Sequence, residues 1–126
     1  MPIKMETDHK RNLTTFSASG ELTYAEQIAA LQEFYGTKPT VNVLWDFRAI
    51  TGNRISSREL GHIIAFVKEN EKKRPAGKTA LVASTDAHFG LSRMSEIMAE
   101  GEGLPWAMRA FRSVERAFDW IDETET

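Results

Sequence analysis

The chain has 126 residues, of which 41% are hydrophobic and 27% are charged. This length and composition are ordinary for a globular protein, and we expect a single domain over residues 1–126. Its 16 basic and 18 acidic side chains give a net charge of −2 at pH 7, so no surplus of one sign predicts a nucleic acid partner. The lack of cysteine excludes disulfides, thiol nucleophiles and thiolate metal sites, and it is typical of the reducing cytoplasm, where we expect the protein.

The amino-terminal third predicts two strands and a helix. The first ten residues are polar apart from Ile3 and Met5, and we expect an edge strand or a frayed end there. Residues 13–18 predict a strand that ends at Gly20. Residues 24–35 predict a helix, because apolar side chains recur at spacings of four, three and four. Gly36 ends this helix, and Pro39 prevents it from resuming.

The middle of the chain contains the clearest helix start. Residues 41–45 are apolar and β-rich and predict a strand inside the sheet, followed by a polar loop over residues 51–53. Ser56 and Glu59 then match a capping box, in which each side chain bonds the other residue's amide. Ile55 and Leu60 supply the hydrophobic staple that accompanies such a cap. The basic run 72–74 is interpreted as a solvated helix end that complements the helix dipole.

The last third repeats the alternation of strand and helix. Residues 79–83 predict a buried strand, and a helix is expected from about Thr85 to the glycines at 101 and 103. Its predicted buried face is Leu91, Met94, Ile97 and Met98. Residues 106–111 predict a last strand, and Ser113 is expected to cap a final helix. The acidic end, residues 122–126, is expected to be a disordered tail.

The resulting order is β-β-α-β-α-β-α-β-α. Strands separated by helices favour parallel pairing. The first two strands have no helix between them, so they can form an antiparallel hairpin. The predicted fold class is therefore α/β, a single domain with a mixed, mostly parallel sheet of four or five strands and about four helices.

Polar residues near strand ends are the candidates for a binding rim, since open α/β sheets place ligands at the carboxyl ends of their strands. The candidates are Asp46, Arg48, Thr51, Asn53, Arg58, Asp86 and His88. Structural roles compete with binding for several of them. Asp46 is also interpreted as a turn residue, and Asp86 as a stabiliser of the first helical turn.

Motifs for catalysis or cofactor binding are missing from the sequence. It has no phosphate-binding P-loop, no dinucleotide fingerprint and no nucleophile elbow. The three histidines, His9, His62 and His88, lack metal-ligand spacing. No apolar run approaches the ~18 residues of a membrane helix, so no integral membrane segment is predicted. We therefore predict no enzyme activity, no cofactor and no metal.

Two segments carry a resemblance to a known family. Residues 43–47, a polar loop and residues 55–60 resemble the core of STAS domains (sulfate transporter and anti-sigma-factor antagonist), where an acid ends a strand and Asp-Ser-Ser-Gly-Leu begins a helix. Residues 90–94, 103–106 and 109–112 resemble the SpoIIAA-like group of small bacterial proteins, which is related to STAS and to CRAL-TRIO lipid-transfer domains. The resemblance covers residues 12–121.

The resemblance implies a non-enzymatic protein that binds a protein partner or an apolar ligand. In the antagonists, a kinase partner phosphorylates the first serine of the motif, and this blocks docking. That serine matches Ser56, with Ser57 beside it, although Ile55 replaces the acid of the motif and Arg58 its glycine. The same hydroxyl already serves as the helix cap, so a purely structural role is the alternative.

Two functions remain open at this level. One is an interaction module that docks a partner or a second copy through residues 46–60 and the following helix. The other is a carrier with an apolar cavity between the sheet and the helix of residues 89–98, which needs about 300 Å³ or more.

Overall fold

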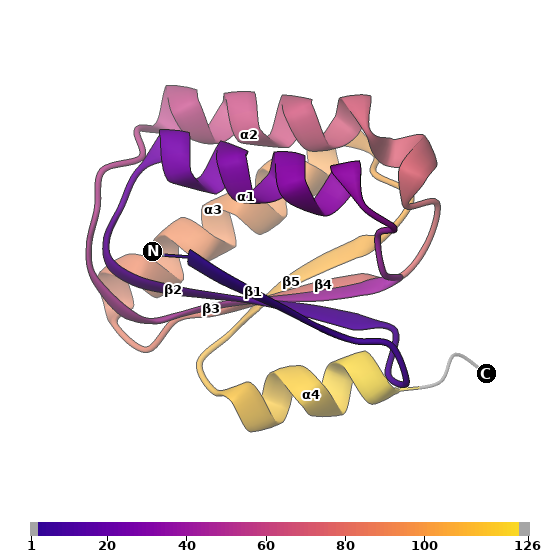
Figure 1. Cartoon of the computed structure of the whole chain (residues 1–126). Coiled ribbons are helices and arrows are strands. Elements are labelled where there is room, and N and C mark those ends of the chain that lie inside the picture. Colours follow the sequence, from indigo (N-terminus) through magenta and orange to yellow (C-terminus); the bar gives the residue numbers. More distant parts are fainter. Residues whose placement is uncertain (1–2, 124–126) are drawn as a thin grey trace.

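The computed structural model describes residues 3–123, and its elements follow the predicted order (Figure 1). They are β1 (Ile3–Asp8), β2 (Leu13–Leu22), α1 (Tyr24–Gly36), β3 (Asn42–Asn53), α2 (Ser57–Glu69), the short 3₁₀ turn η1 (Glu71–Lys73), β4 (Lys78–Val82), α3 (Asp86–Glu102), β5 (Ala107–Phe111) and α4 (Val114–Asp122). Asp122 is the last helical residue, so the prediction of a disordered tail is wrong for this residue; the rest of that prediction, over residues 124–126, lies outside the described part of the chain.

Within residues 3–123 the strands form one five-stranded sheet in the order β1-β2-β3-β4-β5. β1 and β2 form an antiparallel hairpin, and β2, β3, β4 and β5 run parallel, which confirms the predicted mixed sheet and the edge-strand interpretation of the amino end. Helices α1, α2 and α3 lie on one face of the sheet, and α4 lies alone on the other (Figure 1).

The larger core lies between the sheet and α1, α2 and α3. Its centre is aromatic: the rings of Phe16 and Trp45 stack at 4.2 Å, and Phe34 of α1 packs edge-on against Phe16 at 5.7 Å. The smaller core under α4 joins Leu44 and Val82 of the sheet to Ala117 and Ile121 of the helix, among others. β4 and the first half of β3 are therefore buried on both faces, as their continuous apolar sequences predict.

β2 and β3 continue further than their sequences predicted. The predicted boundary at Gly20 and the predicted loop at residues 51–53 are both wrong, because Gly52 and Asn53 pair with Glu21 and Leu22. Gly20 has a φ of +67° and lies where the register between the two strands shifts. A glycine at a bulge lets a strand bend without ending, so it does not mark a terminus here.

The buried face of α3 also differs from the prediction. Ser92 and Ala99 face the interior, each only 4% exposed, whereas Met94 is 38% and Ile97 62% exposed. The small inward side chains let α3 pack closely on its neighbours. Of the predicted buried face, Leu91 and Met98 are half-buried, and only Met94 and Ile97 lie on the outer side of the helix. Sequence periodicity counts apolar residues as core and cannot recognise a face built from small residues.

The basic run 72–74 is not wholly solvated, because Arg74 is 3% exposed whereas Lys72 and Lys73 are exposed. Arg74 Nε and Nη2 donate to the Val41 carbonyl at 3.0 and 2.9 Å, and Nη2 also donates to the Lys78 carbonyl at 2.7 Å. Arg74 Nη1 donates to the Thr79 hydroxyl at 2.6 Å.

The Arg74 guanidinium also stacks over the Trp106 ring at 4.3 Å. Burial lowers the pKa of Arg74 to about 10, and the nearby Tyr35 hydroxyl acts in the opposite direction. The group is therefore still a cation at neutral pH. Its contacts join the segments that begin β3, β4 and β5, so one side chain fixes the relative position of three strand starts.

Replacing this cation tests its structural importance. Arg74→Met is expected to lower the free energy of unfolding by about 3 kcal/mol, because buried carbonyl acceptors lose their donor. The measurement is urea unfolding followed by circular dichroism. The neighbouring exposed Lys72→Met is the matched control and should change stability by less than about 0.5 kcal/mol. An equal, small effect of both variants would contradict the role assigned to Arg74.

Candidate functional site

The four helices of the described chain all begin at the same edge of the sheet, where the parallel strands end. Each begins with a hydroxyl side chain that accepts a hydrogen bond from the amide three residues later; the capping residues are Thr23, Ser56, Thr85 and Ser113. This carboxyl edge therefore presents the positive ends of the helix dipoles, and it is the region that the sequence singled out.

The start of α2 matches the sequence prediction in detail. The Ser56 hydroxyl accepts from the Glu59 amide at 3.1 Å, and the Glu59 carboxylate accepts from the Ser56 amide at 3.0 Å, which completes the capping box. Asn53 precedes the cap, and its side-chain oxygen accepts from the Ile55 amide at 2.9 Å. This turn holds the α2 start at the surface, where Ser56, Ser57 and Arg58 are exposed.

Asp46 and Arg48 do not join the α2 start. Arg48 Nε and Nη2 each donate to an Asp46 carboxylate oxygen at 2.9 Å, and the Arg48 amide donates to the same carboxylate at 3.0 Å. Alternating side chains of a strand point to opposite faces. Because Trp45 and Phe47 pack toward α1, α2 and α3, Asp46 points to the α4 face. The negative charge of Glu115 in α4 accordingly contributes to raising the pKa of Arg48.

The predicted rim is thus divided between the two faces of the sheet. The sequence missed this because it ended the third strand at Trp45, whereas β3 continues to Asn53 and carries Asp46, Arg48 and Thr51 as strand residues. Asp46 therefore has a structural partner within its own strand.

Asp86 and His88 lie at the start of α3, as predicted. Asp86, whose side chain is 95% exposed, pairs with Arg112 at 2.8 Å. The Thr85 hydroxyl accepts from the His88 amide at 3.2 Å. Arg112 also stacks over the Phe89 ring at 4.3 Å, so this end of α3 is joined to the segment that follows β5.

The start of α2 borders an apolar strip on α3. Leu91 and Ser95 of α3 line the same small pocket as Ile55 and Leu60 at the start of α2. Met94 and Ile97 continue the strip along the exposed side of α3, and they are two of the three large apolar residues that are exposed in residues 3–123. We call Ser56, Ser57, Arg58, Met94 and Ile97 the α2–α3 surface.

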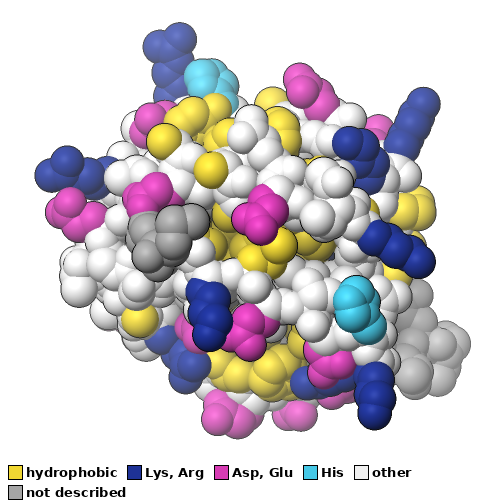
Figure 2. All heavy atoms as spheres, viewed as in Figure 1, with side chains coloured by type: hydrophobic (Ala, Val, Ile, Leu, Met, Phe, Trp, Pro, Cys, Tyr) yellow, Lys and Arg dark blue, Asp and Glu magenta, His cyan; other side chains and the backbone are white. Residues whose placement is uncertain are grey.

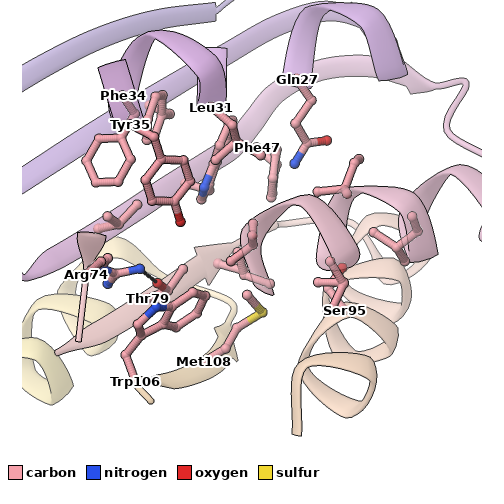
Figure 3. Close-up of a pocket in the computed structure, with 18 residues that line it drawn as sticks. Gln27, Leu31, Phe34, Tyr35, Phe47, Arg74, Thr79, Ser95, Trp106 and Met108 are labelled. Carbon is pink, nitrogen blue, oxygen red and sulfur yellow. Dashed lines mark hydrogen bonds between the residues drawn. The ribbon is translucent and has the colours of Figure 1, made fainter. Parts of the chain in front are cut away.

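A cavity lies between the sheet and the helices that cover it, but it is small. Its volume is about 50 Å³, room for one or two water molecules at roughly 30 Å³ each. Figure 3 shows Tyr35, Arg74, Thr79 and Trp106 gathered at one end of it. Burial raises the pKa of the Tyr35 hydroxyl, which the charge and hydrogen bonding of Arg74 partly oppose. The Trp106 indole nitrogen is buried without a hydrogen-bond partner among the described residues.

Residues 3–123 contain no group of three or more histidine and acidic side chains that could hold a metal ion. None of the helices described is both long enough and apolar enough to cross a membrane. On the face shown in Figure 2, basic and acidic side chains alternate over the surface without a large area of one sign.

Comparison with solved structures shows that this domain has the SpoIIAA-like fold. One similar structure is an uncharacterized protein of the DUF3478 family, described as having a SpoIIAA-like fold, from Shewanella loihica PV-4. It has a TM-score of 0.58 and 18% identity, and the alignment covers 94% of this chain and 91% of that one. The anti-sigma factor antagonist SpoIIAA in its unphosphorylated form has a TM-score of 0.59 and 21% identity, with 98% and 99% covered.

These identities establish the fold and confirm the structural part of the resemblance found in the sequence. No family model matches the chain, and no curated protein is similar to it in sequence. The function therefore has to be argued from this chain's own surfaces.

The Asp46–Arg48 pair predicts a dependence of stability on pH. Burial raises the pKa of the Asp46 carboxyl, but hydrogen bonds from Arg48 and its charge outweigh burial, so the pKa lies below its ordinary value. A carboxyl with a lowered folded pKa stabilises the fold above its unfolded pKa, and this stabilisation is lost as the pH falls through the folded pKa.

We expect Asp46→Asn to lower the free energy of unfolding by about 1 kcal/mol at pH 7. The difference from wild type should shrink as the pH is lowered to about 3, because the wild-type carboxylate becomes protonated. Urea unfolding at several pH values measures this, with the exposed Glu33→Gln as control. A difference that stays constant with pH would show that lost packing, and not charge, is responsible.

Proposed function

We propose that this protein is a non-enzymatic interaction module that docks a protein partner, or a second copy of itself, through the α2–α3 surface. The observation that carries the proposal is the exposure of Met94 and Ile97 on α3, the helix whose Leu91 shares a pocket with the start of α2. An apolar strip next to hydrogen-bonding groups is the usual composition of a protein interface. The lack of cysteine supports a cytoplasmic location for this interaction.

Ser56 is proposed as the regulatory position of this surface. Its hydroxyl is exposed at a helix start, where free amides and the helix dipole stabilise added negative charge. Arg58, two residues later, is also exposed and supplies a nearby cation. A phosphate here would introduce charge directly at the edge of the apolar strip, and a partner that buries the strip would have to desolvate it.

The similar structures support this proposal at the level of the fold. SpoIIAA is described as an anti-sigma factor antagonist, so a protein of this fold acts on another protein. The same description specifies the unphosphorylated form, which supports a phosphorylated position in a protein of this fold. The carrier function is not favoured. The cavity between the sheet and α1, α2 and α3 has only about 50 Å³, against roughly 300 Å³ for a small-molecule site, and the open pocket of about 300 Å³ beside α3 and β5 is lined by Glu96 and Glu100 as well as by apolar residues.

The apolar strip is tested by introducing a charge at its centre. Ile97→Asp is expected to weaken the affinity for a partner or for a second copy at least tenfold, because a carboxylate would be buried in the interface. Native mass spectrometry gives the stoichiometry, and analytical ultracentrifugation gives the dissociation constant. The exposed Lys38→Asp, outside the α2–α3 surface, is the charge-change control. A complex that tolerates Ile97→Asp as well as Lys38→Asp would contradict the proposed surface.

Two substitutions separate the cap from the switch at Ser56. Ser56→Ala should lower the free energy of unfolding by about 1 kcal/mol and leave the affinity unchanged. Ser56→Asp should keep the stability, since aspartate is also a good helix cap, but should weaken the complex. Urea unfolding and the same ultracentrifugation experiment measure both. If Ser56→Asp binds as tightly as wild type, Ser56 is only a cap.

A further inference from the structure

The face of the sheet opposite the α2–α3 surface is covered by one helix only. A helix with its side chains is about 10 Å wide, whereas five strands at about 4.8 Å spacing extend over roughly 20 Å. α4 contacts β4 most, and it also contacts β3 and β5. It does not fill the space over β5 completely, and an open groove of about 830 Å³ lies between β5 and α4.

Three arginines from different parts of the chain line this β5–α4 groove: Arg109 on β5, Arg112 after β5, and Arg116 on α4. All three side chains are exposed. Arg112 pairs with Asp86 and donates to the Ser84 carbonyl at 3.5 Å. Within residues 3–123, neither Arg109 nor Arg116 forms an ion pair. This cluster is basic although the whole chain has a net charge of −2.

Aromatic rings lie beneath two of these cations. The Arg112 guanidinium is 4.3 Å from the centre of the Phe89 ring, and the Arg109 guanidinium is 5.4 Å from that of Phe111. Trp120 packs against Phe111 at 5.5 Å and extends the aromatic floor. A guanidinium that lies over a ring keeps its N–H groups, which point outward in its own plane, free to bind carboxylates.

The groove is also limited in extent. Asp119 and Glu123 line it toward the carboxyl end of α4, whereas Arg112, Ser113 and Arg116 lie at the amino end. The basic region is therefore short and has an acidic boundary. Such a site matches a few anionic side chains in a row and not a long polyanion.

The free edge of β5 is already occupied by a side chain of the protein. The Glu96 carboxylate on α3 accepts from the Ala110 amide at 3.0 Å and is itself paired with Arg93 at 3.0 Å. This contact blocks pairing of a further strand along β5. A bound segment would therefore be recognised by its side chains in the groove and not by strand addition.

We propose that the β5–α4 groove docks a short acidic peptide segment of a protein partner. Arg109 and Arg116 bind its carboxylates, and the ring of Trp120 packs against its side-chain methylenes. The groove is too open to enclose a small molecule, and the net negative charge of the chain repels long polyanions. This site goes beyond the proposed function, because it lies on the other face of the sheet from the α2–α3 surface.

The test uses the 126-residue chain and a fluorescein-labelled, glutamate-rich octapeptide. We expect saturable binding by fluorescence anisotropy that weakens as salt is raised. In NMR spectra, backbone amide shift changes should map to β5 and to the α4 start, and the indole N–H resonance of Trp120 should also shift. The double variant Arg109→Glu/Arg116→Glu should weaken the affinity at least tenfold, and Lys38→Glu should change it less than twofold. Thermal unfolding of each variant confirms that the fold is retained.

Several results would overturn the proposal. They are the absence of binding by wild type, equal binding of a peptide with glutamine in place of each glutamate, and wild-type affinity in the double variant. Tighter binding of single-stranded DNA or of phosphatidylserine vesicles would assign the groove to another class of partner. Ile97→Asp should leave peptide binding unchanged, so failure of the α2–α3 surface and failure of the groove are distinguishable.

Discussion

The structure depends on one buried cation that joins the starts of three strands. Arg74 donates to carbonyl oxygens of Val41 and Lys78 and stacks on Trp106, and no carboxylate is among these contacts. Backbone carbonyls and an aromatic face thus replace water around the guanidinium, which is the condition for burying a charge. The backbone around Arg74 is closely packed. Gly77 has a φ of +114°, and a Cβ at this position would collide with the Val41 carbonyl oxygen.

The two edges of the sheet differ in how their backbone groups are satisfied, and this difference makes the carboxyl edge the candidate binding edge. At the amino edge, side chains satisfy backbone groups directly; Asn12, for example, accepts from the Val41 amide at 2.9 Å. At the carboxyl edge, each of four hydroxyl caps satisfies one amide of its helix, and the other first-turn amides have no partner within the helix backbone. The direction of the parallel strands, and not any single residue, therefore puts Ser56 and Asp86 at the same end of the molecule.

The sequence predicts the fold better than the site, for identifiable reasons. Alternating strand and helix patterns, and the capping box at Ser56, are local signals, and the structure confirms them. The location of Asp46 depends on where β3 ends. The second half of β3 contains polar residues and a glycine, so its sequence resembles a loop although it continues the strand. The burial of Arg74 depends on contacts with residues up to 33 positions away, which no local pattern encodes. The spacing of Arg109, Arg112 and Arg116 is visible in the sequence, but only the topology shows that they share a groove.

Both candidate surfaces have one geometric origin, a sheet that is wider than the helices that cover it. On the fuller face, α3 is in contact mainly with β5, the last strand of the sheet, and it meets α2 on one side only. Its outer side has no further helix in residues 3–123 to pack against, so Ile97 is exposed even though α3 is anchored by Ser92 and Ala99. On the other face, α4 lies over β3, β4 and β5 without filling the space above β5, and the open groove lies between that strand and the helix. The apolar strip and the basic groove therefore both lie near β5, but on opposite faces of the sheet.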